Sequence, residues 1–317
     1  MSHDAVAMKK VFFVGVNLLG DLLCTTPIIR AFRRRNPDVF ITYIVHNATY
    51  CRVLDANPDI DQTLYSERLY LEGEAVFGEE WLRSLPLDIR EPSQIYRFNI
   101  HEVCRMSPGV FDDHITAAFS KFVGIPVDSI RPVVRVTTED HRTAAALLRG
   151  RPYVVLSMHS TTRVVGSDGE LVDKSWPAGR WLQLAKEIRS WGDFDVISIG
   201  SETDAQVTSP YFRNLYGLPI KTVSALLQEA ACVVAVESGI THLCHAVDAP
   251  MVVIFSKFVP LAWANPREAR RARIFHEDPA AVSCEEVVSA VKSIVCGSAL
   301  ASAANTASIS PSRSSAG

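Results

Sequence analysis

Polar side chains that could do chemistry stand at four places where a run of apolar residues has just ended. The residues concerned are Asp21 after the first run, Thr161, Thr162 and Lys174 after a later one, Glu202 after the next, and Glu237, Ser238, Gly239 and His242 after another. A carboxylate can take a proton from a hydroxyl group. Hydroxyl groups, an ammonium group and the start of a helix can hold an anion such as a diphosphate. These residue types could therefore take up a proton or bind an anion at the ends of the strands.

The apolar runs are typical of buried parallel strands, which must be apolar on both faces when helices cover both sides of their sheet. We expect strands over residues 11–16, 40–45, 153–158, 194–199, 232–236 and 251–255, and helices over 112–123, 139–148, 179–191, 223–231 and 238–247. A further helix after the first strand ends at Arg33, Arg34 and Arg35, where cations interact favourably with a helix C-terminus. Strands that alternate with helices predict doubly wound α/β sheets, whose ligands bind beyond the carboxyl ends of the strands.

The length of 317 residues suits two domains, since one domain commonly has about 150 residues. We place the boundary between residues 1–150 and 151–297, where a helix ends on Gly150 and a proline precedes the next strand. Residues 65–110 show poor periodicity, which indicates loops around short strands. Residues 298–317 are small and polar without a period, so we expect a disordered tail.

The composition excludes several classes of protein. Hydrophobic residues make up 48% and charged residues 21%, as in folded soluble proteins. No uncharged apolar run approaches the roughly 18 residues of a membrane span, and the N-terminus lacks the pattern of a signal peptide, so we expect a cytoplasmic protein. A net charge of -3 gives no overall positive field of the kind that nucleic-acid-binding proteins use. No Walker-type loop or G-x-G-x-x-G occurs, which argues against a P-loop ATPase or a Rossmann dehydrogenase.

The seven cysteines are odd in number, dispersed, and never arranged as Cys-x-x-Cys. A disulfide framework or a structural zinc site is therefore not expected, and the thiols should be reduced and mostly buried. His242 and His245 have i, i+3 spacing with Cys244 between them, but no carboxylate completes a metal set. We therefore predict no metal.

Four motifs together resemble one known family. They are GD-x-x-x-x-T-P from Gly20, paired threonines leading to K-x-W-P at Lys174, G-x-E ending at Glu202, and E-S-G-x-x-H from Glu237. In this order they resemble the ADP-heptose heptosyltransferases of glycosyltransferase family 9, over most of residues 9–257. The resemblance implies a GT-B fold, in which two Rossmann-like domains face each other across a cleft. It also implies transfer of a heptose from an ADP-sugar, with inversion, to lipopolysaccharide core or a related glycan.

The resemblance places the general base at Asp21. The alternative is that Asp21 caps its helix by accepting backbone N–H groups. Thr161, Thr162 and Lys174 match the diphosphate-binding group, which would need no metal or other cofactor. The alternative there is that the threonines cap a turn and Lys174 is solvated. The segment 163–173 is longer than usual in the family, and Arg163 could share the phosphate role.

Ser238 and Gly239 open a helix whose N–H groups form a second anion site. His242 could donate to a phosphate or a sugar, or it could be a structural histidine. Glu237 stands where family members usually have aspartate, and its longer side chain alters the geometry of any hydrogen bond. Glu202 matches the acid that contacts adenosine or ribose, unless it only begins the next helix.

Other functions remain open at this stage. The fold also suits transfer of another nucleotide sugar, or sugar-nucleotide epimerisation, for which we identify no convincing set of extra acid–base residues. A noncatalytic nucleotide-sugar-binding module would tolerate the loss of Asp21. Two basic clusters, residues 33–35 and the arginines of 267–273, are by default solvated helix faces. With a phosphorylated lipid acceptor, one of them could make peripheral contact with the inner membrane.

Overall fold

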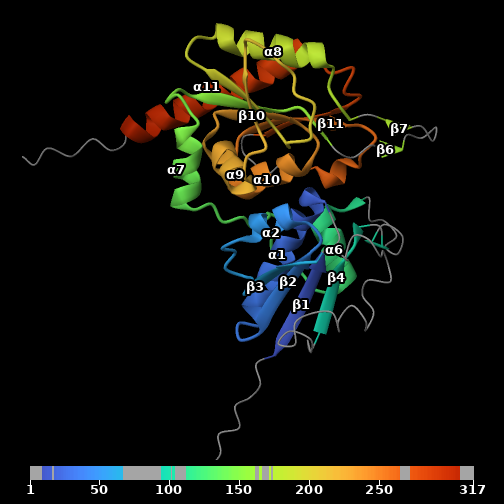
Figure 1. The fold of residues 1–317 in the computed structure, drawn as a ribbon. Coiled ribbons are helices and arrows are strands. Elements are labelled where there is room, and N and C mark those ends of the chain that lie inside the picture. Colours follow the sequence, from blue (N-terminus) through green and yellow to red (C-terminus); the bar gives the residue numbers. More distant parts are fainter. Residues whose placement is uncertain are drawn as a thin grey trace, which may run out of the picture.

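The computed structural model describes residues 9–15, 18–66, 94–100, 102–103, 112–160, 164–165, 171–172, 174–264 and 272–307. They form two parallel β-sheets stacked one above the other, each packed with helices (Figure 1). The predicted architecture of two doubly wound α/β units is confirmed. None of the helices in these ranges is both long and apolar enough to cross a membrane.

The first sheet has the strand order β3-β2-β1-β4, and every neighbouring pair is parallel. Its strands are β1 (Lys10–Gly15), β2 (Phe40–Val45), β3 (Gln62–Tyr65) and β4 (Gln94–Phe98), and its helices are α1 (Leu19–Arg35), α2 (Ala48–Leu54) and α6 (Ile115–Val123). The side chains of β1 and β2 are almost wholly buried, as their apolar sequences require. Helix α6 ends at Gly124, whose φ of 70° is the left-handed conformation expected of a glycine C-cap.

The second sheet has the order β12-β11-β10-β5-β8-β9 and is also parallel throughout. Its strands are β5 (Tyr153–Ser157), β8 (Asp195–Gly200), β9 (Arg213–Tyr216), β10 (Cys232–Val236), β11 (Met251–Ser256) and β12 (Ala272–Glu277). Its helices are α8 (Ala178–Ser190), α9 (Ile220–Glu229), α10 (Gly239–Val247) and α11 (Cys284–Ala307), with a 3-10 turn, η4 (Leu261–Trp263). Two short strands, β6 (Val164–Val165) and β7 (Leu171–Val172), pair antiparallel outside this sheet.

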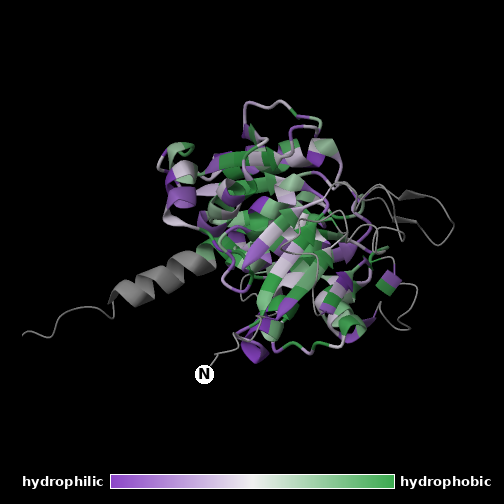
Figure 2. Ribbon diagram, turned by 60° about the horizontal axis from the view of Figure 1, so that its bottom comes forward, coloured by the Kyte–Doolittle hydropathy of each residue, from purple (hydrophilic) through white to green (hydrophobic). Residues whose placement is uncertain are grey.

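Two hydrophobic cores lie on opposite faces of the second sheet. One lies beneath α8 and α11, where Leu184 and Val287 pack against alternate residues of the strands. The other lies on the face covered by α9 and α10 and continues into the first half, so that Leu243 and Leu23 belong to the same cluster. The green strands in the interior of Figure 2 show this concentration of apolar side chains. The two halves are therefore joined by a continuous apolar core.

Helix α7 (Thr138–Ala146) lies beside the second half, although it precedes the predicted boundary at residue 150. It packs against α9, and the Arg213 guanidinium donates to the Leu147 carbonyl at 2.6 Å. The chain therefore crosses between the sheets before α7. The glycine and proline of residues 150–152 connect this helix to β5, and the domain boundary at residue 150 stays a prediction.

The last helix differs from the expectation for the C-terminus. Helix α11 continues to Ala307, so residues 298–307 have a helical backbone where a disordered tail was expected. The physical reason is that this stretch is rich in alanine, which has the highest helix propensity of all residues and needs no tertiary contact to favour a helix. Residues 308–317 lie outside the described ranges.

Candidate functional site

Asp21 lies in the first turn of α1, just beyond the carboxyl end of β1. The residue before the helix, Leu18, offers no side-chain cap, and the Asp21 carboxylate accepts a hydrogen bond from the Leu18 backbone N–H. This is the backward half of a capping box. The capping contact considered from the sequence is therefore present, and it holds the carboxylate in place at the start of the helix.

The environment of Asp21 changes its acidity. Burial raises the pKa of Asp21 to about 7, and the negative charge of Glu237 acts in the same direction. The Leu18 N–H and the Lys174 ammonium group oppose the shift. A carboxyl group with a pKa near 7 exchanges its proton at neutral pH, as a general base should.

Lys174 and Glu237 form an ion pair next to Asp21. The Lys174 Nζ donates to Glu237 Oε2, and the two side chains are only 4% and 16% exposed. The suggestion that Lys174 is merely solvated is therefore wrong. Glu237 follows β10 directly, and Lys174 lies four residues before the start of α8, so the pair belongs to the second half of the molecule.

The N-termini of α1 and α10 meet at two glycines. A Cβ atom on Gly239 would lie 3.1 Å from Leu19 Cβ and 3.2 Å from the Gly20 backbone nitrogen. A Cβ on Gly20 would lie only 2.9 Å from His242 Cδ2. The positive ends of two helix dipoles thus converge, which favours negative charge between them. Ser238 caps α10, and its Oγ accepts from the Ile240 N–H at 3.3 Å.

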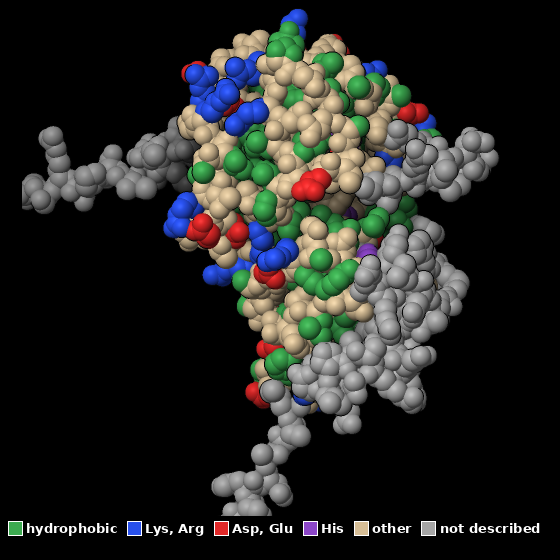
Figure 3. Space-filling model, in the orientation of Figure 1, with side chains coloured by type: hydrophobic (Ala, Val, Ile, Leu, Met, Phe, Trp, Pro, Cys, Tyr) green, Lys and Arg blue, Asp and Glu red, His purple; other side chains and the backbone are tan. Residues whose placement is uncertain are grey.

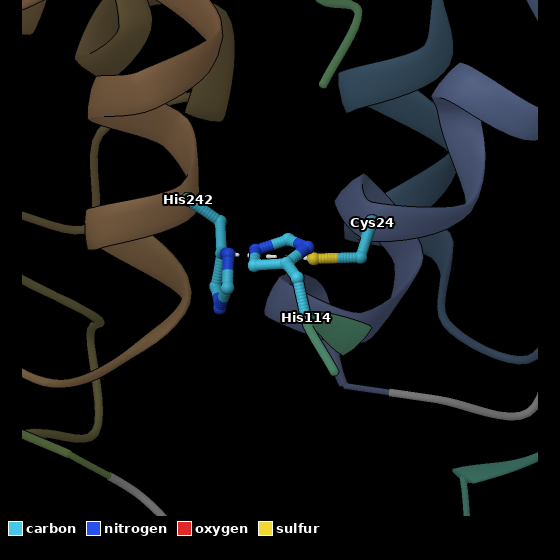
Figure 4. A group of neighbouring side chains, drawn as sticks. All are labelled: Cys24, His114 and His242. Carbon is cyan, nitrogen blue, oxygen red and sulfur yellow. Dashed lines mark hydrogen bonds between the residues drawn. The ribbon is translucent and has the colours of Figure 1, made fainter. Parts of the chain in front are cut away.

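His242 contacts residues of the other half. Its Nδ1 lies 3.3 Å from Cys24 Sγ, and its ring lies edge-on to that of His114, with 6.2 Å between ring centroids (Figure 4). Burial raises the pKa of the Cys24 thiol well above its usual range, and Asp21 adds to this. The thiol therefore keeps its proton and can donate to Nδ1, which leaves the N–H of His242 on Nε2.

The remaining predicted site residues lie elsewhere or outside the described residues. Glu202 is exposed after the end of β8, and its Cγ lies 2.5 Å from where a Cβ on Gly217 would be. Thr161, Thr162 and Arg163 lie outside the described residues. The structure thus brings Asp21 together with one end of the anion site but places Glu202 at another strand end.

Sequence reasoning missed several residues around these strand ends. Tyr216 OH lies 3.1 Å from both His159 Nε2 and Ser198 Oγ, and this network links the carboxyl ends of β5, β8 and β9. Cys24 and His114 were also missed, although Cys24 lies inside the first motif and His114 lies inside the helix predicted over residues 112–123. His114 is the N-cap of α6, a role for which Ser, Thr, Asp and Asn are the usual signals.

The cysteine and metal predictions have different outcomes. Within the described ranges, Cys24, Cys51, Cys232, Cys244, Cys284 and Cys296 are free thiols, and four of them are buried. His242 does not pair with His245 but lies in a group with Cys24 and His114, whose potential ligand atoms are all within 4.8 Å of one another. The absence of a metal stays a prediction.

Comparison with known proteins gives one family. The family model described as glycosyltransferase family 9 (heptosyltransferase) matches residues 101–292. No curated protein sequence gives a match. A family 9 glycosyltransferase from Veillonella parvula is 15% identical, with 91% of this chain and 97% of that chain covered and a TM-score of 0.66.

Two enzymes from E. coli have the same fold. The ADP-heptose lipopolysaccharide heptosyltransferase II is 15% identical, with 92% of this chain and 99% of that one covered and a TM-score of 0.65. The heptosyltransferase WaaC, solved with ADP, is 14% identical over 92% and 99% of the two chains, with a TM-score of 0.57. All three matches span nearly the full length of both chains, so the fold of both halves is shared.

Proposed function

This chain belongs to glycosyltransferase family 9, and we propose that it transfers a heptose with inversion from an ADP-activated donor to a glycan acceptor such as lipopolysaccharide core. Its GT-B fold and its glycosyltransferase class follow from the family match and the shared architecture. The identity of the sugar, the nucleotide and the acceptor is the proposed part.

The observation that carries the proposal is the position of Asp21 opposite the Lys174–Glu237 pair. Asp21 comes from the first half and the pair from the second, and both charges of the pair act on the pKa of Asp21. In an inverting transfer the base takes the proton of the acceptor hydroxyl while the diphosphate leaves from the opposite side of the sugar carbon. We assign the base to Asp21 because its raised pKa allows it to hold that proton at neutral pH.

The leaving diphosphate is stabilised, in this proposal, by groups of the chain itself. Lys174 supplies a desolvated positive charge, and the start of α10 at Ser238 and Gly239 supplies the positive end of a helix dipole. Thr161 and Thr162 complete the group. No metal or other cofactor takes part in the transfer. Glu237 already holds Lys174, so the diphosphate must share the ammonium group with it or displace it.

His242 is assigned a supporting role toward the donor. Its Nδ1 lies 3.3 Å from Cys24 Sγ, so we assign the contact with a phosphate or sugar oxygen to Nε2. Glu202, at the carboxyl end of β8, is assigned to the ribose or adenosine. The exposed position of Glu202 leaves it accessible to a nucleotide bound along the strand ends.

The acceptor in this proposal is a glycan or glycolipid. We propose action in the cytoplasm, with peripheral contact at the inner membrane. The arginines of residues 33–35 give little support, because Arg33 binds Asp61 and Arg34 lies 3.6 Å from Asp128. Figure 3 shows basic side chains in separate groups mixed with acidic ones on the visible face. Of the second basic cluster, Arg267, Arg270 and Arg271 lie outside the described residues, so its part in a membrane contact stays a proposal.

A donor screen tests the proposal directly. Calorimetric titration with ADP, UDP and GDP should give the tightest binding for ADP, and ADP-heptose should be consumed in the presence of a lipopolysaccharide-core acceptor. Proton NMR of the product should show inverted configuration at the transferred carbon. Preference for another nucleotide would favour transfer of a different sugar. Binding of ADP-heptose without turnover on a panel of glycan acceptors, unchanged in Asp21→Asn, would favour the noncatalytic binding module.

A further inference from the structure

A group of metal-ligating side chains lies where the two halves of the molecule meet. Cys24 comes from α1, His114 from the start of α6 and His242 from α10, so three separate segments contribute (Figure 4). One potential ligand atom of each lies within 4.8 Å of the other two. All three side chains are at least nine-tenths buried, with Cys24 completely shielded from solvent.

The types of ligand favour particular metals. One sulfur and two imidazole nitrogens form a set that binds Zn²⁺ and similar first-row ions, whereas Mg²⁺ and Ca²⁺ require oxygen ligands. A thiolate further favours Zn²⁺ over the lighter first-row ions. The negative charge of Asp21 acts on Cys24 and would also favour a cation there.

The distances are close to those of a tetrahedral site. Bonds of about 2.3 Å to sulfur and about 2.0 Å to nitrogen place the two ligand atoms roughly 3.5 Å apart. Cys24 Sγ and His242 Nδ1 are 3.3 Å apart, so this pair needs almost no adjustment. The third ligand must approach by no more than about 1.5 Å, since no ligand atom is further than 4.8 Å from another.

Coordination by the third ligand, His114, costs a hydrogen bond, so the three ligands should not bind the metal equally strongly. His114 Nδ1 accepts a hydrogen bond from the Thr116 N–H at 3.2 Å, so coordination through Nδ1 would displace that contact. A neutral imidazole has one N–H, and coordination through Nε2 moves that proton to Nδ1. The contact from Thr116 is then lost. His114 should therefore be the weakest of the three ligands.

From this geometry we propose that Cys24, His114 and His242 form a mononuclear site for a thiolate-binding metal ion, best matched by Zn²⁺, that fastens the two halves of the molecule together. On binding, the Cys24 thiol releases its proton to solvent and the sulfur and the His242 Nδ1 lone pair bind the ion. Coordination through Nδ1 leaves the proton of His242 on Nε2, so the role proposed for His242 toward the donor is compatible with a bound metal. The metal proposal does not rest on the proposed reaction.

Cobalt(II) is a suitable probe for the full-length protein after treatment with a chelator. We expect one Co²⁺ per chain, with the near-ultraviolet charge-transfer band of a thiolate ligand and visible bands of tetrahedral intensity, and displacement of Co²⁺ by Zn²⁺. Zn²⁺ should also raise the melting temperature, because it binds only the folded arrangement. Absence of the thiolate band, or of saturable binding, would overturn the proposal.

Variants identify the ligands. Loss of a residue that only orients a metal ligand costs about 10–100-fold in affinity. Cys24→Ser should therefore weaken Co²⁺ binding by more than about 100-fold and abolish the charge-transfer band, and His114→Gln should have a smaller effect. Cys51→Ser and His141→Gln remove the same side-chain types away from the group and should bind as the wild type does. Wild-type binding by Cys24→Ser would refute the site.

Proton release provides a measurement that needs no variant. In weakly buffered solution with an indicator dye, binding of the metal should release about one proton per ion from the Cys24 thiol. Binding at exposed histidines alone, at a pH where they are neutral, would release none. A saturating metal signal without proton release would therefore also contradict the proposal.

Discussion

The Lys174 ammonium group and the Glu237 carboxylate form an ion pair that is nearly closed to solvent and acts on Asp21 from the other half of the molecule. The two members of the pair affect Asp21 in opposite directions. The positive charge of Lys174 lowers the pKa of Asp21, and the negative charge of Glu237 raises it. The pKa of Asp21 therefore depends on how the two halves of the molecule are arranged.

Asp21→Asn should remove activity while leaving the fold intact. The asparagine Oδ1 can still accept from the Leu18 N–H, so the free energy of unfolding at pH 5 should change by less than about 1 kcal/mol. The transfer rate should fall by about 10² to 10⁴, the usual contribution of a positioned base. Steady-state kinetics with thermal unfolding of both proteins measures this. Near-wild-type turnover would leave Asp21 with only its capping role.

The transfer rate should depend on the ionisation of Asp21. Because only the carboxylate can accept a proton, kcat/KM should rise with pH through a midpoint near the Asp21 pKa of about 7. A pH–rate profile between pH 5 and 9 checks this. A midpoint near the usual aspartate value of about 4 would show that the carboxylate is not buried in the working enzyme.

Stability should show the opposite dependence on pH. The pKa of Asp21 is higher in the folded protein than the ordinary value of 3.8. Between about pH 4 and pH 7, the carboxyl group is therefore protonated in the folded state and ionised in the unfolded state. The contribution of Asp21 to stability is therefore greatest below pH 4 and is lost as the pH rises to 7. Relative to Asp21→Asn, the wild type should lose melting temperature over this range. Parallel curves for the two proteins would contradict the raised pKa.

Changing either member of the ion pair should shift the pH–rate profile in a predictable direction. Glu237→Gln removes a charge that raises the Asp21 pKa, so the midpoint should move to lower pH, and Lys174→Met should move it to higher pH. Each single variant leaves a buried charge without its partner and should lose up to about 3–5 kcal/mol, with part of the loss recovered in the double variant. Shifts of the same sign would show that the pair does not face Asp21.

The meeting of α1 and α10 should be sensitive to one added methyl group. In Gly20→Ala the new Cβ would lie 2.9 Å from His242 Cδ2, and the overlap should cost about 1–3 kcal/mol. Gly179→Ala in α8 is the matched control, because nothing lies within 4 Å of its added Cβ. The control should be neutral or more stable by up to about 1 kcal/mol. Chemical denaturation measures both, and equal stabilities would show that the halves do not contact each other there.

The sequence alone determines the strands at the centre of each sheet. Both faces of β1, β5, β10 and β11 are covered, so their side chains must be mostly apolar. Such a continuous apolar run can be recognised in the sequence without knowledge of the neighbouring strands. The edge strands β9 and β12 are only partly buried and mix polar with apolar residues. The edge strands therefore lack a continuous apolar run in the sequence. They form because the neighbouring strand supplies their backbone hydrogen bonds.

The same division holds for the site. Asp21 and Glu237 could be identified from the sequence because ligands of a parallel sheet bind just beyond the strands, and Lys174 could be identified from the K-x-W-P motif of the family that the sequence resembles. Their charges and mutual distances do not follow, because the pKa of Asp21 depends on burial created when the halves pack together. Cys24 and His242 are 218 residues apart, and no local pattern links them. Only the packing of α1 on α10 brings these two side chains into contact.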